Sequence, residues 1–182
     1  MHKAVFLDRD GVINEVIFRN ENTLKPIAPW SMEEFSLLSG IKCPLLNLKK
    51  LEFKLFVVTN QPDIAKGVID HSFVTKVNEV ISREFPIDEI RVCPHVDLDG
   101  CECRKPKSGM ILSLAKKWNI DCQNSFLIGD SWRDMEAGKK AGSTTILLEK
   151  HYNRGVEADY KINNLSQVAE IINKIDSCRQ SR

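Results

Sequence analysis

The stretch AVFLDRDG, residues 4–11, decides the fold, because an apolar run leads directly into two aspartates and a glycine. β-Branched and aromatic residues without polar alternation are typical of a strand that is buried on both faces. Two further runs follow the same plan, KLFVVTNQ at 54–61 and NSFLIGDSWRD at 124–134. Strands of this kind predict a parallel sheet with polar, reactive side chains at the end of each strand.

Amphipathic helical patterns lie between and after these runs, at residues 41–50, 72–85, 108–119 and 165–175. Additional short strands are predicted at 89–93, 144–148 and 160–162. Strands that alternate with helices predict an α/β fold with a doubly wound, mainly parallel, Rossmann-like sheet. Ligands bind such sheets at the carboxyl ends of the strands. We therefore expect one site that collects polar residues far apart in sequence, namely Asp8, Asp10, Thr59, Asn60 and Asp130.

The length of 182 residues suits a single domain, which we expect to span residues 1–176. Residues 14–30 carry little periodicity and are expected to form a loop or flap after the first strand. The last residues, 177–182, are expected to form a frayed tail.

Charged residues make up 28% of the chain and nearly cancel, which leaves a formal net charge of +1. A dedicated nucleic-acid surface normally shows a clustered basic excess, so this balance argues against nucleic acid as a partner. No run of about 20 apolar residues occurs and the first residues show no signal-peptide pattern, so we expect neither a membrane span nor a signal peptide. We expect a cytoplasmic monomer that does not bind a membrane and acts on a small molecule.

Each polar strand end also has an ordinary structural explanation. Two exposed acids after a strand are common, Thr and Asn cap helices, and the macrodipole favours an acid such as Asp134 in a first helical turn. Taken singly, these explanations are adequate. A site becomes the better interpretation because the motifs occur in order and at the same edge of one sheet.

In the identity and order of these motifs, the chain resembles the phosphatases of the haloacid dehalogenase (HAD) superfamily. The motifs are DRDG at 8–11, TN at 59–60, Lys105, and GDSWRD at 129–134, and the resemblance extends over residues 5–148. No insertion is long enough for a cap domain, so the resemblance is to the subgroup without a cap.

The resemblance implies a role for each matching residue. Asp8 is expected to attack phosphorus and form an aspartyl-phosphate, and Asp10 to act as general acid and then general base. Mg²⁺ is expected on the side chains of Asp8 and Asp130 and on the Asp10 carbonyl. The resemblance places phosphate-binding or supporting roles on five further residues, Thr59, Asn60, Arg104, Lys105 and Asp134. Mg²⁺ and Lys105 are expected to neutralise the phosphate before a carboxylate attacks it.

Residues 93–103 form a loop rich in metal-binding side chains, with the spacing C-x-H-x5-C-x-C. Three thiolates and one imidazole match a closed tetrahedral zinc site. A disulfide is disfavoured in a reducing compartment, although a redox switch stays open. We expect a structural Zn²⁺ on Cys93, His95, Cys101 and Cys103, and we expect it to brace the adjoining Arg104 and Lys105.

Two phosphatase groups share this loop, those that act on D-glycero-D-manno-heptose 1,7-bisphosphate and those that act on histidinol phosphate. Arg104-Lys105 and the stretch GMILSLAKKW at 109–118 favour the heptose enzymes, whereas the short spacer between His95 and Cys101 favours the histidinol enzymes. The motif TNQPDIAKG at 59–67 departs from the heptose pattern through Pro62-Asp63, and Lys66 is expected to meet a second phosphate. A DNA-end phosphatase and a non-catalytic binding module are further alternatives.

Overall fold

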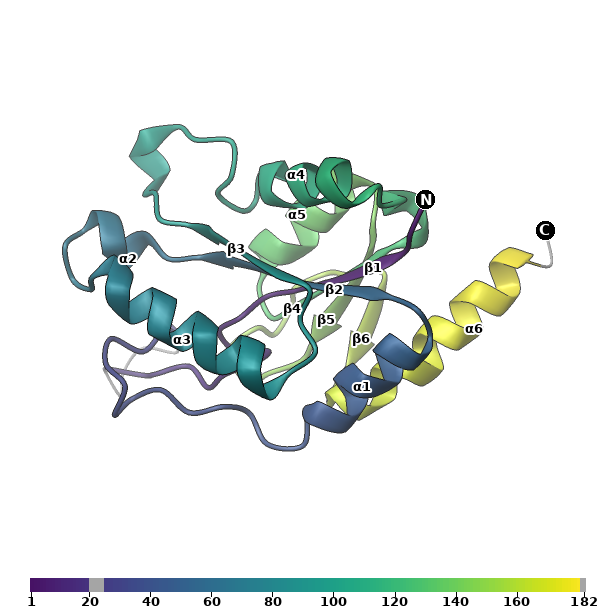
Figure 1. Cartoon of the computed structure of the whole chain (residues 1–182), viewed down its shortest axis with the longest axis horizontal. Helices are drawn as coiled ribbons and strands as arrows, with labels where there is room; N and C mark the ends of the chain where they lie inside the picture. Colours follow the sequence, from purple (N-terminus) through teal and green to yellow (C-terminus); the bar gives the residue numbers. More distant parts are fainter. Residues whose placement is uncertain (20–24, 181–182) are drawn as a thin grey trace.

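The computed structural model describes residues 1–19 and 25–180, the last four of these as helix backbone (Figure 1). The described strands are β1 (Ala4–Leu7), β2 (Lys54–Asn60), β3 (Glu89–Cys93), β4 (Phe126–Gly129), β5 (Thr144–Leu148) and β6 (Tyr160–Ile162). They form a six-stranded sheet in the order β3-β2-β1-β4-β5-β6, in which every pair is parallel. The predicted parallel α/β sheet is confirmed.

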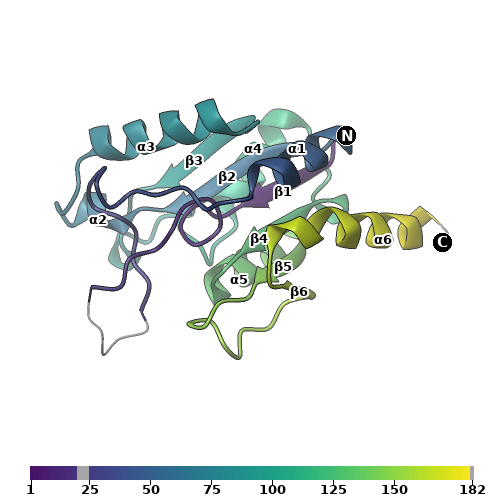
Figure 2. The same cartoon turned by 90° about the horizontal axis from the view of Figure 1, so that it is seen from below.

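Helices cover both faces of the sheet (Figures 1 and 2). Their bounds are α1 (Lys42–Lys50), α2 (Pro62–Ala65), α3 (His71–Glu84), α4 (Gly109–Trp118), α5 (Trp132–Ala141) and α6 (Val168–Gln180). Figure 1 shows α1, α3 and α6 below the sheet and α4 and α5 above it. The helix α6 continues to Gln180, so it includes most of the segment predicted to be a frayed tail.

The strands supply apolar side chains to both layers by simple alternation. In β1, Val5 and Leu7 join the core under α1, α3 and α6, while Ala4 and Phe6 join the core under α4 and α5. This two-sided burial explains why the strand sequences show no polar alternation. The sheet is thus fixed between two apolar layers, and polar residues gather where the strands end.

The prediction of regular structure missed α2 and α5. The helix α5 packs on the sheet through Met135 and the small residues Ala137, Gly138 and Ala141, so it lacks the series of large apolar residues by which α1, α3, α4 and α6 were predicted. A Cβ on Gly138 would lie 2.7 Å from Thr145 Cγ2, which shows how closely the helix approaches the sheet. Small side chains therefore serve here the purpose that large apolar ones serve in the other helices.

The segment after β1 turns back on itself within its described part. Antiparallel bridges join Ile17 to Ile27 and Asn14 to Leu37. Residues 20–24 of the predicted loop at 14–30 lie outside the described residues. The described part thus forms a flap beside the carboxyl end of β1.

Candidate active site and metal centre

The centre of the site lies at the carboxyl end of β1, the strand between β2 and β4. Asp8 follows β1 directly, and its N–H donates to the carbonyl of Ile128 in β4. Lys105 Nζ lies 2.8 Å from Asp8 Oδ1 and 2.5 Å from Asp134 Oδ1, and its side chain is almost wholly buried. Parallel topology therefore brings together a carboxylate, a fixed cation and a second carboxylate from three distant segments.

Asp134 holds Lys105 in place. While Oδ1 pairs with Lys105, Oδ2 accepts hydrogen bonds from the N–H and the hydroxyl of Ser131 at the start of α5. The Asp134 side chain is fully buried, so these partners compensate for its removal from water. The resemblance leaves two supporting roles for Asp134, holding the metal or orienting the lysine, and the geometry favours the second.

Asp10 is held at both carboxylate oxygens. Oδ1 accepts hydrogen bonds from Asn14 Nδ2 at 3.0 Å and from Arg9 Nη2 at 3.2 Å. Oδ2 accepts from Gln61 Nε2 at 2.7 Å and from Thr59 Oγ1 at 3.4 Å. Four donors thus fix the orientation of a carboxylate that lies two residues from Asp8.

Asp130 follows β4 and is 5% exposed. Its Oδ2 accepts a hydrogen bond of 2.5 Å from the Tyr152 hydroxyl, and its carbonyl accepts one of 2.8 Å from Asn153 Nδ2. One oxygen each of Asp8, Asp130 and Asp134 lie within 4.8 Å of one another, a group that could hold a metal ion. Carboxylate oxygens are the ligands that Mg²⁺ prefers.

The charges of this cluster do not balance in the protein alone. When all four carboxylates are ionised, Asp8, Asp10, Asp130 and Asp134 face two buried cations, on Arg9 and Lys105. One divalent cation would supply the missing positive charge. The donor set and the charge therefore both fit Mg²⁺.

The same crowding shifts the pKa values of the site. Burial, followed by the negative charge of Asp134, raises the pKa of Asp8 well above its usual value and raises the pKa of Asp130 to about 7. Burial alone would lower the pKa of Lys105, but Asp134 and Asp8 raise it well above its usual value. Lys105 therefore stays charged, and a bound cation would lower the pKa values of both acids again.

Asn60, which the resemblance places near the substrate, contacts the main chain of Lys105 in this structure. Its side-chain amide donates to the carbonyl of Lys105 and accepts from the N–H of Lys105, each at 3.0 Å. Both polar atoms are thereby used on the main chain of the loop that carries the lysine. The geometry favours a positioning role for Asn60.

Arg104 and Lys66 each have an acidic partner. Arg104 Nε donates to Asp97 Oδ1 at 2.6 Å, and Nη1 donates to the carbonyl of His95 at 3.1 Å. Lys66 Nζ lies 2.8 Å from Asp63 Oδ1. Asp63 Oδ2 also accepts a hydrogen bond of 2.9 Å from Trp30 Nε1, which ties the segment after β1 to α2. Both predicted substrate cations are therefore neutralised in this structure.

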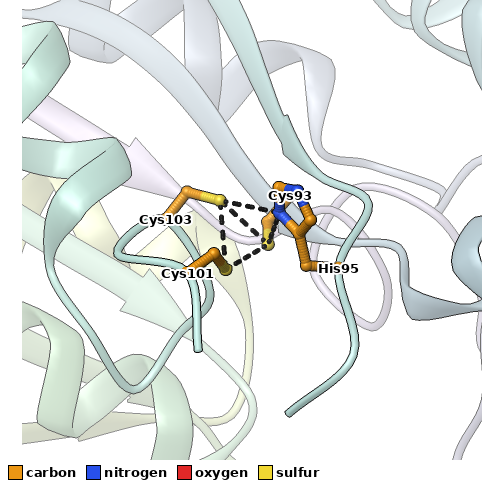
Figure 3. A group of neighbouring side chains, drawn as sticks. All are labelled: Cys93, His95, Cys101 and Cys103. Atoms are coloured by element: carbon orange, nitrogen blue, oxygen red, sulfur yellow. Dashed lines mark hydrogen bonds between the residues drawn. The ribbon is translucent and has the colours of Figure 1, made fainter. Parts of the chain in front are cut away.

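The predicted zinc ligands form a compact cluster (Figure 3). Cys103 Sγ lies 3.1 Å from Cys93 Sγ, 3.4 Å from Cys101 Sγ and 3.3 Å from His95 Nδ1. Cys93 Sγ lies 3.6 Å from His95 Nδ1 and 3.7 Å from Cys101 Sγ. With Zn–S bonds of about 2.3 Å, the sulfurs of a tetrahedral site lie ~3.8 Å apart. The cluster has nearly the dimensions that a zinc ion requires.

Several residues of the site were not predicted, namely Arg9, Asn14, Gln61, Tyr152 and Asn153. Arg9 is fully buried beside Asp10, although its position in the DRDG motif resembles an exposed turn. Tyr152 lies in the segment after β5, where the sequence shows no motif. Its position follows only from the pairing of β5 with β4, which directs that segment toward Asp130.

Comparisons with known proteins agree with this geometry. The HAD-hydrolase-like family profile matches residues 102–174. The chain is 34% identical to D-glycero-alpha-D-manno-heptose-1,7-bisphosphate 7-phosphatase of Campylobacter jejuni, over 96% of this chain and 98% of the relative. It is 38% identical to the corresponding beta-anomer phosphatase of Rhodopseudomonas palustris, over 76% of this chain and 79% of the relative.

Among solved structures, the chain is similar to D,D-heptose 1,7-bisphosphate phosphatase of B. bronchiseptica, which was complexed with magnesium and phosphate. The TM-score is 0.79 at 27% identity, and the alignment covers 94% of this chain and 98% of that one. This similarity extends over nearly the whole chain. The chain belongs to the heptose-1,7-bisphosphate 7-phosphatase family of HAD-like phosphatases.

Proposed function

We propose that the chain is a Mg²⁺-dependent phosphatase that removes one phosphate from D-glycero-D-manno-heptose 1,7-bisphosphate. The observation that carries this proposal is the pairing of Asp8 with the buried Lys105, beside Asp130, at the carboxyl end of the central strand. This arrangement offers a nucleophile, a fixed cation and metal ligands within one small volume. The names of the relatives supply the substrate class.

In the proposed reaction an Asp8 carboxylate oxygen attacks phosphorus as the P–O bond to the sugar breaks. The departing alkoxide takes a proton from Asp10, which several donors hold in place. A water molecule then attacks the phosphorus of the aspartyl-phosphate, Asp10 accepts its proton, and the bond to Asp8 breaks. The ammonium of Lys105 lies beside Asp8 and neutralises charge on the equatorial oxygens.

Mg²⁺, when bound to the side chains of Asp8 and Asp130 and to the Asp10 carbonyl, supplies Lewis-acid stabilisation of the phosphoryl oxygens. In this proposal Asp134 and Asn60 are positioning residues for Lys105. Thr59 meets the transferring phosphoryl group. Arg104 and Lys66 meet the second phosphate after leaving their acidic partners.

We further propose that Cys93, His95, Cys101 and Cys103 hold a structural Zn²⁺. Four protein ligands leave no open position for a reacting water, so the ion braces the loop and does no chemistry itself. The cluster needs reduced thiols, which supports a cytoplasmic location. We also propose that residues 1–176 act as one domain and as a monomer.

A comparison of kcat/KM over a panel of esters tests the substrate. The panel holds both anomers of heptose 1,7-bisphosphate, a heptose monophosphate and histidinol phosphate, which the short spacer between His95 and Cys101 favours. A preference of roughly a thousandfold, or ~4 kcal/mol, for one bisphosphate anomer is expected. An equal preference for histidinol phosphate would overturn the proposed substrate. Turnover by the Asp8→Asn variant would show that Asp8 is not the nucleophile.

A further inference from the structure

We infer that Tyr152 is a positioning residue for the metal centre, and this inference rests on the proposed function. Its hydroxyl donates a 2.5 Å hydrogen bond to Asp130 Oδ2, the carboxylate that follows β4. With Oδ2 engaged, the carboxylate presents its other oxygen to a cation in a single orientation.

Hydrogen bonds of the neighbouring Asn153 fix the position of the segment that carries Tyr152. Asn153 is 7% exposed, and its Nδ2 donates to the carbonyls of Asp130 at 2.8 Å and Leu148 at 2.9 Å. Its Oδ1 accepts from the N–H of Lys150 at 2.9 Å. Asn153 thus joins the end of β5 to the end of β4, and it does so one residue after the tyrosine.

Gly11 provides the space for the contact. It has a φ of +86°, and a Cβ built there would overlap Asp130 Oδ2 and lie 2.7 Å from the Tyr152 hydroxyl oxygen. The main chain after β1 therefore packs directly against the pair of side chains. Three separate segments, following β1, β4 and β5, meet at this one carboxylate.

Aromatic contacts orient the ring of Tyr152. The ring centroids of Phe18 and Tyr152 lie 5.7 Å apart, and those of His151 and Tyr152 lie 5.2 Å apart in an edge arrangement. Phe18 and His151 also contact each other, with centroids 5.3 Å apart. The hydroxyl is thus aimed by packing at one end and by Asp130 at the other.

A structural role and a positioning role predict different results for Tyr152→Phe, which keeps the ring and removes the hydroxyl. Loss of a partner that orients a metal ligand typically weakens metal affinity by about 10- to 100-fold. We expect that loss for Mg²⁺ alone, measured by calorimetry without substrate. At saturating Mg²⁺ the KM for the bisphosphate is expected to stay within about twofold, since Tyr152 has no proposed contact with the sugar.

Tyr160→Phe is the matched control, because the chain has two tyrosines and Tyr160 lies 41% exposed on β6. Its Mg²⁺ affinity is expected to equal that of the wild type. Phe18→Leu separates the ring contact from the hydrogen bond and is expected to weaken Mg²⁺ binding less than Tyr152→Phe.

Labelling with 3-fluorotyrosine gives a second readout that needs no variant of Tyr152. The ¹⁹F resonance of Tyr152 is expected to move as Mg²⁺ is added, while that of Tyr160 stays in place. An unchanged Mg²⁺ affinity in Tyr152→Phe would overturn the inference. Tighter binding would also overturn it, because the hydroxyl would then compete with the metal. If Tyr152→Phe fails to fold, a ¹⁹F resonance of Tyr152 that does not move when Mg²⁺ is added would likewise overturn the inference.

These outcomes are distinct from a failure of the proposed substrate. A protein that binds Mg²⁺ through Tyr152-supported Asp130 but hydrolyses no bisphosphate would contradict only the substrate. A wild-type protein that binds no Mg²⁺ would overturn both proposals.

Discussion

Asn60 and Lys105 exchange two hydrogen bonds of 3.0 Å, with the side-chain amide of the first against the main chain of the second. The pair joins the end of β2 to the loop that carries the site cation. A primary amide has one donor group and one acceptor, so the single side chain of Asn60 satisfies both the carbonyl and the N–H of Lys105.

Asn60→Asp keeps the shape of the side chain and removes the donor. A carboxylate oxygen would then face the Lys105 carbonyl, so we expect the free energy of unfolding to fall by about 1–3 kcal/mol. Displacement of Lys105 should also lower kcat by about 100-fold. Urea unfolding and steady-state kinetics check both effects. Asn47→Asp, on the exposed side of α1, is the control, and equal losses in the two variants would contradict the role given to Asn60.

Mg²⁺ binding should depend on pH because burial, followed by the charge of Asp134, raises the pKa of Asp130 to about 7. A raised pKa in the folded state stabilises the metal-free protein at low pH, and this stabilisation is lost as pH rises through about 7. Mg²⁺ binds the ionised form, so the Tm increase caused by Mg²⁺ should grow between about pH 5 and pH 8.

Thermal unfolding at several pH values, with and without added Mg²⁺, measures this trend. Chelators should be avoided because they would also remove the proposed Zn²⁺ from the cysteine cluster. Asp130→Asn, which cannot titrate, should flatten the dependence. An increase in Tm that is equal at all pH values in the wild type would contradict the prediction.

Removal of zinc should lower activity through the loop that carries Lys105. Cys103 lies two residues before the lysine, and its Sγ contacts the other three members of the cluster. Cys103→Ser is expected to lose bound zinc and about 100-fold in kcat, because a shift of 1 Å is enough for such a loss. Zinc content by atomic absorption and kinetics test this. Cys43→Ser, at an exposed cysteine outside the cluster, is the control; a zinc-free variant with full kcat would contradict the brace.

Asp63 should weaken the contribution of Lys66 to substrate binding, because the two side chains pair at 2.8 Å. Asp63→Asn keeps an acceptor for Trp30 Nε1 and removes the charge that holds the lysine. The KM for the bisphosphate is expected to fall by up to about fivefold, or ~1 kcal/mol, the usual range for exposed ion pairs. The KM for a monophosphate should not change.

The double variant Asp63→Asn with Lys66→Met provides the control for this effect. The double variant should not show the lower KM for the bisphosphate, since it lacks the Lys66 ammonium that Asp63→Asn releases. An equal improvement with the bisphosphate and the monophosphate would show that Lys66 does not meet the second phosphate.

The strands and the polar residues at their ends could be predicted because burial on both faces leaves a simple apolar pattern. Topology then required Asp8, Thr59 and Asp130 to meet, and the structure places them together. The contacts of Asn60 and Lys66 were not predicted, since Asn60 depends on a distant segment and the sequence alone does not show whether Lys66 pairs with Asp63, three residues earlier. For Lys66 the partner is Asp63, and for Asn60 it is the main chain of Lys105.

Tyr152 and Arg9 show a different limit of the sequence. A tyrosine in a loop and an arginine between two aspartates carry no spacing that marks them as part of a site. Only the neighbouring position of β5, and the burial of the Arg9 side chain, give these residues their contacts. The helix α5 was missed for a related reason, because its packing face consists mostly of small side chains.

The central position of β1 also has a consequence during synthesis on the ribosome. β1 pairs with β2 on one side and with β4 on the other, and β4 lies more than a hundred residues later in the chain. Until residue 129 has left the ribosome, one edge of this apolar strand stays open to pairing with other chains. At about 5–20 residues per second, that interval lasts several seconds. The strand that anchors the nucleophile thus has an unpaired edge during most of the synthesis of the chain.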